Sequence, residues 1–269
     1  MKAFTTGLAA LAVGMAICIG GAASARSFDD ILSSKKLVVG VNPTLPPLAK
    51  FNDQNQIEGF DVDVAKKFAD MLGVSLEVVQ VGSPDRVPFV ASGKVDIVMG
   101  GLTRTPDRAK VIDFTVPLHT EALGVLTTEA KPFKSWKELN NPDVKLVEVR
   151  GTTSVDFIKK NLPKAQIILL DNYPDVIRAL AQGRGDAVVD VIDYLGMFMK
   201  AETVKWKILN DVNAGVDYDG IGVARGNEAL LRWLNVALFQ LQSDGVIDDI
   251  YKKWFGLEMV YPIKPSPYF

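Results

Sequence analysis

Residues 100–108 read GGLTRTPDR and directly follow the segment DIVM at residues 96–99. The apolar segment predicts a buried strand, and Thr105-Pro106 predicts the start of a short helix with proline in its first turn. The loop between them offers backbone N–H groups, the Thr103 hydroxyl and an arginine guanidinium, which together suit a small carboxylate. Alternatively, Arg104 and Arg108 are surface charges paired with Asp107 or Asp113. The loop therefore indicates either an anion site or an ordinary charged turn.

The residues before this loop alternate between strand and helix patterns. We expect strands at 37–41, 75–79 and 95–99 and helices at 61–72 and about 85–92. Asp61 is placed to cap the helix that Gly73 ends, and we interpret both Asp61 and Asp63 as structural. Such alternation predicts a mostly parallel sheet flanked by helices.

The same pattern restarts beyond residue 127. Strands are expected at 145–149 and 167–170, and helices from 153 to about 161 and at 174–182. Residues 91–100 align without gaps to residues 181–190 with four identities, so each half contains a helix, a Gly-x-x-Asp turn and a buried strand. The prediction of two lobes does not depend on this internal similarity.

The expected organisation is therefore a two-lobed α/β protein. Residues 26–125 together with 220–269 form lobe 1, which ends in helices at 228–243 and 246–255, and residues 126–219 form lobe 2. We expect the chain to cross between the lobes at 124–128 and 220–224. Two segments that cross a cleft make a hinge.

Residues 1–25 have the pattern of a signal peptide. Lys2 supplies a positive charge, residues 3–19 are apolar, and Ala23-Ser24-Ala25 is a cleavage site, so the mature chain should begin near Arg26. The alternatives are a membrane anchor or a lipid on Cys18, and Ile17 is unsuited to the lipid-attachment pattern. Cleavage near Ala25 removes the only cysteine, so we expect neither a disulfide nor a thiol nucleophile.

Composition excludes several kinds of function. The chain has 269 residues, of which 48% are apolar and 23% are charged, which suffices for a large core in one or two domains. The 30 basic and 32 acidic residues leave no excess of positive charge for nucleic acid. His119 is the single histidine, and neither a catalytic triad, a metal-ligand cluster nor a P-loop can be assembled from the sequence. We therefore expect no catalytic residue, no metal and no cofactor, and we interpret His119 as a satisfied or surface histidine that could border the cleft.

Five motifs carry a resemblance to a known family. The chain contains T-P-x-R at 105–108, D-F-[ST] at 113–115, G-F-D-x-D at 59–63, R-x-P at 86–88 followed by G-K-x-D at 93–96, and a closing helix at 244–256. Together they resemble the bacterial extracytoplasmic solute-binding proteins of family 3, the polar amino-acid receptors of ABC importers. The resemblance covers residues from about 36 to 256.

This resemblance implies a fold and a binding site. The fold would be the type II periplasmic-binding-protein fold, in which two α/β lobes close on a small carboxylate, with an amino acid as the first candidate. Arg108 would form a two-toothed pair with the ligand carboxylate. The other donors implied on the two sides of the cleft are Gly101, Thr103, Thr152 and Thr153.

The sequence departs from many relatives in the loop after the first strand. This loop, residues 42–48, begins with Asn42 and lies where open α/β sheets bind ligands. Many relatives carry aromatic residues in the places of Leu45 and Leu48, the first of which stacks on the ligand. Stacking of about 0.5–1.5 kcal/mol would be missing here, which disfavours an ordinary cationic or aromatic amino acid.

The partner of a ligand ammonium is a second departure. Relatives place an aspartate five residues after the Gly-x-x-Asp aspartate, and that position, counted from Asp186, is Val191. Asp190 comes one residue early and would face the cleft if the strand ends by Val189, whereas Asp193 would be the N-cap of the next helix. We favour Asp190; in the alternative, both aspartates are structural and the ligand has no ammonium.

Two functions remain after these considerations. The first is a monomeric periplasmic receptor that delivers its ligand to an ABC permease in the inner membrane. The second is a cyclohexadienyl dehydratase-like enzyme on the same scaffold, acting on prephenate or arogenate. Asp190 or Asp193, with a pKa raised by burial, would be its proton donor.

Overall fold

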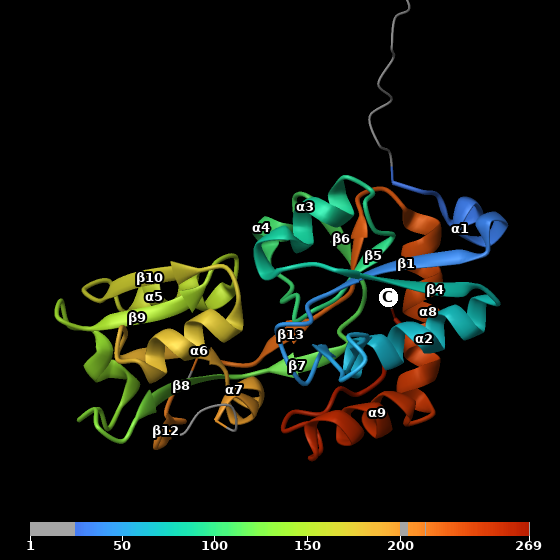
Figure 1. Ribbon diagram of the computed structural model, residues 1–269. Coiled ribbons are helices and arrows are strands. Elements are labelled where there is room, and N and C mark those ends of the chain that lie inside the picture. The colour runs from blue at the N-terminus through green and yellow to red at the C-terminus, as the bar shows by residue number, and fades with distance from the viewer. Residues whose placement is uncertain (1–24, 200–203, 213, 269) are drawn as a thin grey trace, which may run out of the picture.

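Two α/β lobes joined by a narrow connection form the protein (Figure 1). The computed structural model describes residues 25–199, 204–212 and 214–268. The expected leader at residues 1–25 lies outside these residues except for Ala25. Within the described part of the chain, none of the helices combines the length and the apolar character that a membrane span requires.

Lobe 1 is built on a five-stranded sheet in the order β4-β1-β5-β14-β6. Its strands are β1 (Lys36–Val41), β4 (Ser75–Gln80), β5 (Ile97–Val98), β6 (Ile112–Phe114) and β14 (Gly222–Ala224), and β2 (Lys50–Phe51) pairs with β3 (Ile57–Glu58) in a separate hairpin. Its helices are α1 (Phe28–Ser34), α2 (Phe60–Leu72), the 3-10 turn η1 (Ser83–Asp85), α3 (Arg86–Ala91), α4 (Pro106–Ala109), α8 (Glu228–Ser243) and α9 (Val246–Phe255).

Lobe 2 contains the second five-stranded sheet, in the order β10-β9-β11-β8-β12. Its strands are β8 (Leu123–Thr128), β9 (Lys145–Val149), β10 (Gln166–Leu170), β11 (Ala187–Val191) and β12 (Trp206–Leu209). The helices of this lobe are the 3-10 turn η2 (Trp136–Leu139), α5 (Thr153–Asn161), α6 (Tyr173–Ala181) and α7 (Ile192–Phe198). The two-lobed α/β fold expected from the sequence is confirmed.

One strand in each sheet enters from the other lobe and runs against its neighbours. β1 is parallel to β4 and β5, whereas β14 is antiparallel to β5 and β6. In lobe 2, β9 is parallel to β10 and β11, whereas β8 is antiparallel to β11 and β12. Each sheet therefore has a parallel part, as expected, and an antiparallel part that the crossing of the chain creates.

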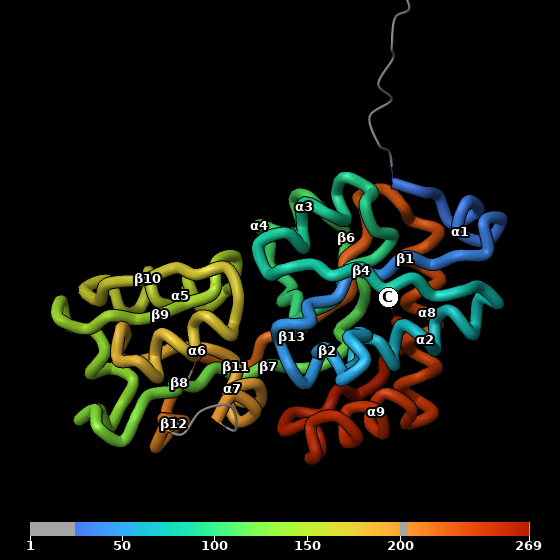
Figure 2. Tube along the Cα trace, viewed as in Figure 1, coloured from blue at the N-terminus to red at the C-terminus, as the bar shows by residue number. Residues whose placement is uncertain are grey.

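The crossings themselves lie elsewhere than the sequence analysis placed them. Residues 124–128 belong to β8 inside lobe 2, and residues 220–224 lead into β14 inside lobe 1. Between the two large sheets, β7 (His119–Glu121) pairs with β13 (Asp217–Asp219) as an antiparallel ribbon, visible between the lobes in Figure 2. The prediction of the crossings was wrong because the apolar runs 123–126 and 221–224 are sheet strands, while the ribbon is polar. The inner lobe boundaries, residues 125/126 and 219/220, stay predictions.

The internal similarity has a structural counterpart in two turns that each carry an aspartate. Asp96 and Asp186 occupy the same place in the two aligned segments, after α3 and α6 respectively. Asp96 accepts the Val38 N–H of β1 at 2.7 Å, and Asp186 accepts the Lys145 N–H of β9 at 2.7 Å. Both aspartates thus satisfy a donor at the start of the neighbouring parallel strand.

Asp61 is not the helix cap that the sequence suggested. Gly59, with φ 149°, is the N-cap residue, so Asp61 lies inside the first turn. Its carboxylate is buried and accepts no hydrogen bond within the described residues. Burial raises its pKa to about 8, against the opposing influence of the Gly100 N–H and Arg86. Asp63 is structural as expected, because it accepts from Lys253 and Trp254 and ties α2 to α9.

Candidate functional site

A small buried cavity lies between the two lobes, which we call the inter-lobe cavity. Its volume is about 10 Å³, roughly the room that one water needs, so a solute can enter only when the lobes separate. Lobe 1 and the ribbon contribute Arg86, Gly101, Thr103 and Glu121, and lobe 2 contributes Thr152, Thr153, Ser154, Tyr173, Asp190, Val191 and Tyr194.

Direct contacts hold the lobes together around this cavity. Arg108 of α4 donates to Thr103 O at 2.6 Å and reaches across to Gly151 O of lobe 2 at 2.9 Å. The Thr103 and Thr153 hydroxyls lie 3.4 Å apart. From α7, Tyr194 donates its hydroxyl to Glu121 Oε1 at 2.6 Å. The structure therefore shows the lobes closed on each other.

The double-glycine turn is shaped by a buried arginine. Arg86, only 2% exposed, donates to Gly100 O at 2.6 Å and also to Gly101 O. Its second terminal nitrogen lies 3.4 Å from Gly151 O. Gly100 and Gly101 both have positive φ, 89° and 66°, which glycine adopts without steric cost. The turn of residues 100–103 is thus fixed by a cation beneath it.

Asp190 lies at the lobe 2 side of the inter-lobe cavity. Its Oδ1 accepts the Val191 N–H at 2.7 Å, whereas Oδ2 accepts no hydrogen bond within the described residues. Burial raises the pKa of Asp190 to about 7, and Glu121 acts in the same direction, while Tyr173 and Arg86 oppose the shift. Asp190 therefore lines the inter-lobe cavity and has one carboxylate oxygen that accepts no hydrogen bond from the described residues.

Five of the residues expected at the site line the inter-lobe cavity, namely Gly101, Thr103, Thr152, Thr153 and Asp190. Three others do not. Arg108 lines a separate cavity of about 360 Å³ at the outer edge of the lobe contact. Asn42 donates to Ser83 Oγ at 3.1 Å and accepts from Thr44, so it holds its own loop, and Leu45 is buried.

Asp193 has a different position from the one expected. β11 continues through Val191, which is the N-cap residue of α7, so Asp193 falls in the first turn and is not the cap. Its carboxylate accepts the Tyr251 hydroxyl of α9 at 3.1 Å. Asp193 thus fastens lobe 2 to lobe 1, while Asp190 lines the inter-lobe cavity even though the strand does not end before it.

Several lining residues were not identified from the sequence. Arg86 is the arginine of the R-x-P motif at 86–88, so this motif could have identified it as a site residue. Glu121, Tyr173 and Tyr194 carry no local pattern that separates them from surface residues. Tertiary folding alone brings them together, since Tyr194 and Glu121 are 73 positions apart.

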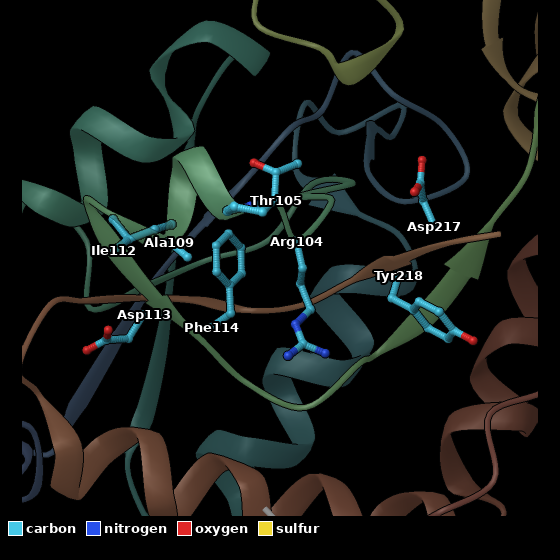
Figure 3. Close-up of a pocket in the computed structure, with 9 residues that line it drawn as sticks. Arg104, Thr105, Ala109, Ile112, Asp113, Phe114, Asp217 and Tyr218 are labelled. Carbon is cyan, nitrogen blue, oxygen red and sulfur yellow. The ribbon is translucent and has the colours of Figure 1, made fainter. Parts of the chain in front are cut away.

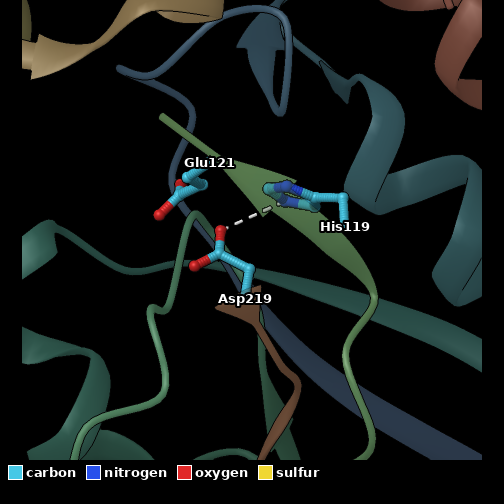
Figure 4. A group of neighbouring side chains, drawn as sticks. All are labelled: His119, Glu121 and Asp219. Atoms are coloured by element: carbon cyan, nitrogen blue, oxygen red, sulfur yellow. Dashed lines mark ion pairs between the residues drawn. The ribbon is translucent and has the colours of Figure 1, made fainter. Parts of the chain in front are cut away.

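The sequence suggested no metal-ligand cluster around His119, whereas the structure brings three potential ligands together. The imidazole of His119 and the carboxylates of Glu121 and Asp219 are all buried, and one ligand atom from each lies within 4.8 Å of the others (Figure 4). This group could not be recognised in the sequence because Asp219 is 100 positions away from His119 and meets it only through the β7–β13 pairing.

Arg104 does not line the inter-lobe cavity. Figure 3 shows it beside Phe114 and Tyr218 in an open surface cavity of about 480 Å³. The acidic residues Asp113 and Asp217 also line this cavity. Asp107 pairs with Lys110 at 2.7 Å, so the alternative in which it pairs with one of the two arginines is not found.

Two α/β lobes with a polar cavity between them are the architecture of the bilobed solute-binding proteins. Residues 37–257 match the bacterial extracellular solute-binding proteins, family 3, and the chain belongs to this family. It is 32% identical over 243 residues to the ABC transporter glutamine-binding protein GlnH of Bacillus subtilis strain 168, covering 87% of this chain and 88% of that one.

Two further similarities extend over nearly the whole relative. The chain is 26% identical over 268 residues to the L-cystine-binding protein TcyJ of Escherichia coli K12, covering 96% of this chain and 99% of that one. Among solved structures, the ancestral amino acid-binding protein AncCDT-1, a precursor of cyclohexadienyl dehydratase, aligns with a TM-score of 0.79 at 34% identity. That alignment covers 84% of this chain and 98% of the ancestral protein.

Proposed function

We propose that this protein is a monomeric periplasmic receptor that captures an amino acid between its lobes and delivers it to an ABC permease. The relatives named above bind glutamine and cystine, or amino acids in general, and two of them span nearly the same length as this chain. The observation that carries the proposal is the inter-lobe cavity. Its lining includes Thr103, Thr153 and the buried carboxylate of Asp190.

Each end of an amino acid has a proposed partner. The ligand carboxylate is bound by Arg108, Thr103 and the backbone N–H groups near Gly101 and Thr153, in place of the contacts that Arg108 now makes with Thr103 O and Gly151 O. Thr152, whose hydroxyl donates to Val149 O at 2.9 Å, positions the lobe 2 turn. Asn42 and Leu45 support the opposite wall.

We assign the ligand ammonium to Asp190. The free Oδ2 atom of this buried carboxylate would gain a charged donor on binding. Asp193 is unsuited to this role because it is engaged by Tyr251. An amino acid is favoured over a simple carboxylate because a solute without an ammonium would leave Asp190 buried and unpaired.

The second candidate is a dehydratase acting on prephenate or arogenate. What favours it is the pKa of about 7 of Asp190, which suits a proton donor near neutral pH. We place it second because the similarity in that direction is to an ancestral binding protein and not to the enzyme. If neither prephenate nor arogenate is converted, the protein is a receptor and no residue of the cavity is catalytic.

A ligand panel tests both candidates. Thermal unfolding is followed with each free amino acid, with the matching 2-keto acids, and with prephenate and arogenate. We expect at least one amino acid to raise the unfolding temperature by binding the folded state, and its keto acid to be weaker. Asp190→Asn should remove that preference and Asp193→Asn should keep it. Formation of phenylpyruvate from prephenate would refute the receptor, and stabilisation by keto acids alone would refute the ammonium assignment.

A further inference from the structure

The ribbon formed by β7 and β13, which we call the hinge ribbon, carries three potential metal ligands on one side. His119 and Glu121 are two residues apart on β7, so their side chains project to the same face, and Asp219 of β13 is paired directly with His119. We call these three residues the hinge cluster. His119 and Asp219 are each 2% exposed and Glu121 is 4% exposed, so water reaches none of them freely.

The carboxylate of Asp219 lacks the partners that its burial demands. Neither of its oxygens accepts a hydrogen bond from the described residues, although Oδ2 lies 3.1 Å from His119 Nε2. A buried, unpaired carboxylate is costly unless a proton or a cation neutralises it. The cluster contains two carboxylates, and its only other member is an imidazole.

The orientation of the imidazole identifies what faces Asp219. His119 Nδ1 lies 3.4 Å from Thr120 O, which can only accept a hydrogen bond, so the ring hydrogen belongs on Nδ1. Nε2 then presents a lone pair toward a carboxylate oxygen. Two acceptors 3.1 Å apart repel each other unless a proton or a metal ion lies between them. Metal-binding histidines commonly donate their other N–H to a backbone carbonyl in this way.

Glu121 is oriented by donors that leave room for a cation. Its Oε1 accepts from Tyr194 at 2.6 Å and its Oε2 accepts from Thr103 at 3.1 Å. Each carboxylate oxygen has a second lone pair, so these two hydrogen bonds fix the group without using its full capacity. Hydrogen-bonded carboxylates are typical of ligands in metal sites.

We propose that the hinge cluster binds a divalent transition-metal ion, with Zn²⁺ the best match, through His119 Nε2 and the carboxylates of Glu121 and Asp219. One imidazole and two carboxylates suit zinc, whose bonds to such atoms are about 2.0–2.2 Å. Two ligands on a tetrahedral ion then lie about 3.4 Å apart. The separation of 3.1 Å between His119 and Asp219 is close to this value, and one oxygen of Glu121 lies within 4.8 Å of both ligand atoms.

The position of this site gives the metal a role in the hinge. His119 and Glu121 belong to one crossing of the chain and Asp219 to the other, so the ion would fasten the two crossings together. Glu121 also lines the inter-lobe cavity. Metal binding and solute binding would therefore be linked, and each would change the affinity of the other by the same factor.

The single histidine of the chain makes a direct test feasible. The protein is produced with ¹⁵N-labelled histidine and without a polyhistidine tag, cleared of metal with a chelator, and titrated with ZnCl₂. Since His119 is the only histidine, its two ring nitrogens give the only imidazole signals. We expect Nδ1 to remain protonated and the Nε2 resonance to shift until one equivalent is bound. Unchanged ring signals at saturating Zn²⁺ would overturn the proposal. A ring that stays protonated on both nitrogens at saturating Zn²⁺ would also overturn it and would show an ion pair between His119 and Asp219.

Variants locate the site independently of that spectrum. In competition with a chromogenic chelator, Asp219→Asn should weaken Zn²⁺ binding by about 100-fold or more, because it removes a ligand. Asp217→Asn is the matched control, since it makes the same change on the same strand at an exposed position outside the cluster. Equal losses in the two variants would show a general effect of charge and refute the site. If Asp219→Asn fails to fold, Glu121→Gln replaces it in the same comparison. Solute binding by the metal-free protein would leave the proposed receptor function intact.

Discussion

Gly151 offers a sharp test of lobe closure. It lies on lobe 2 with φ 82°, and a β-carbon built on it would lie 2.8 Å from Pro84 Cα in lobe 1. Backbone cannot yield as a flexible side chain can, so Gly151→Ala should prevent the lobes from closing fully. Overpacking of this kind costs about 1–3 kcal/mol, which corresponds to a loss of solute affinity of about 5- to 150-fold.

Gly183 supplies the control for backbone strain. It has φ 71°, and a β-carbon there would meet nothing within 4 Å. Gly183→Ala therefore carries a similar conformational cost of about 1–2 kcal/mol without a collision between lobes. Isothermal titration with the solute found in the panel should show a loss for Gly151→Ala and near wild-type affinity for Gly183→Ala. Equal affinities in two folded variants would refute the closed arrangement described above.

Three further predictions follow from the site and the buried carboxylates. Arg108→Ala should weaken solute binding by about 100-fold or more, since hydrogen bonds to charged groups contribute about 1.5–3 kcal/mol each. Arg104→Ala, in the same loop, is the control and should keep the wild-type affinity. Similar affinities of the two variants in a titration would remove Arg108 from the site. Because the pKa of Asp190 is about 7, affinity for an amino acid should fall by about tenfold per pH unit below that value, and titrations from about pH 5 to 8 should show no such slope in Asp190→Asn. Folding raises the pKa of Asp61 from 3.8 to about 8, so the folded state binds a proton in that window and stability falls as the pH rises through it. In denaturant unfolding, the free energy of unfolding of Asp61→Asn should not fall over this pH range. The same pH dependence in wild type and variant would contradict a raised pKa of Asp61.

The sequence predicted the scaffold wherever local signals were strong. Helices α8 and α9 begin and end at the expected residues, because apolar periodicity is interrupted by polar and glycine residues at both ends. Thr105 caps α4 through its hydroxyl, as the T-P pair indicated. Such features depend on a few consecutive residues, so they can be read without knowledge of the fold.

The hinge could not be predicted in the same way. Residues 123–128 are apolar and extended whether they cross between lobes or lie within a sheet, so the pattern does not decide between the two. The true crossing at His119–Glu121 is polar and would ordinarily be taken for a surface strand. It becomes buried because β13 and the Tyr194 side chain cover it, and both come from distant parts of the chain.

Tyr194 offers a physical reason why Leu45 and Leu48 stand where an aromatic residue was considered in the sequence. A β-carbon on Gly101 would lie 3.3 Å from both Leu45 and Leu48 and 3.4 Å from the Tyr194 hydroxyl, so these three side chains surround one point at the edge of the inter-lobe cavity. Tyr194 is held there by Glu121 and by its ring contact with Phe255, at 6.3 Å between centroids. A large aromatic residue on the loop of lobe 1 would compete with this tyrosine for space. In the closed arrangement, the aromatic group at this wall is therefore Tyr194 of lobe 2.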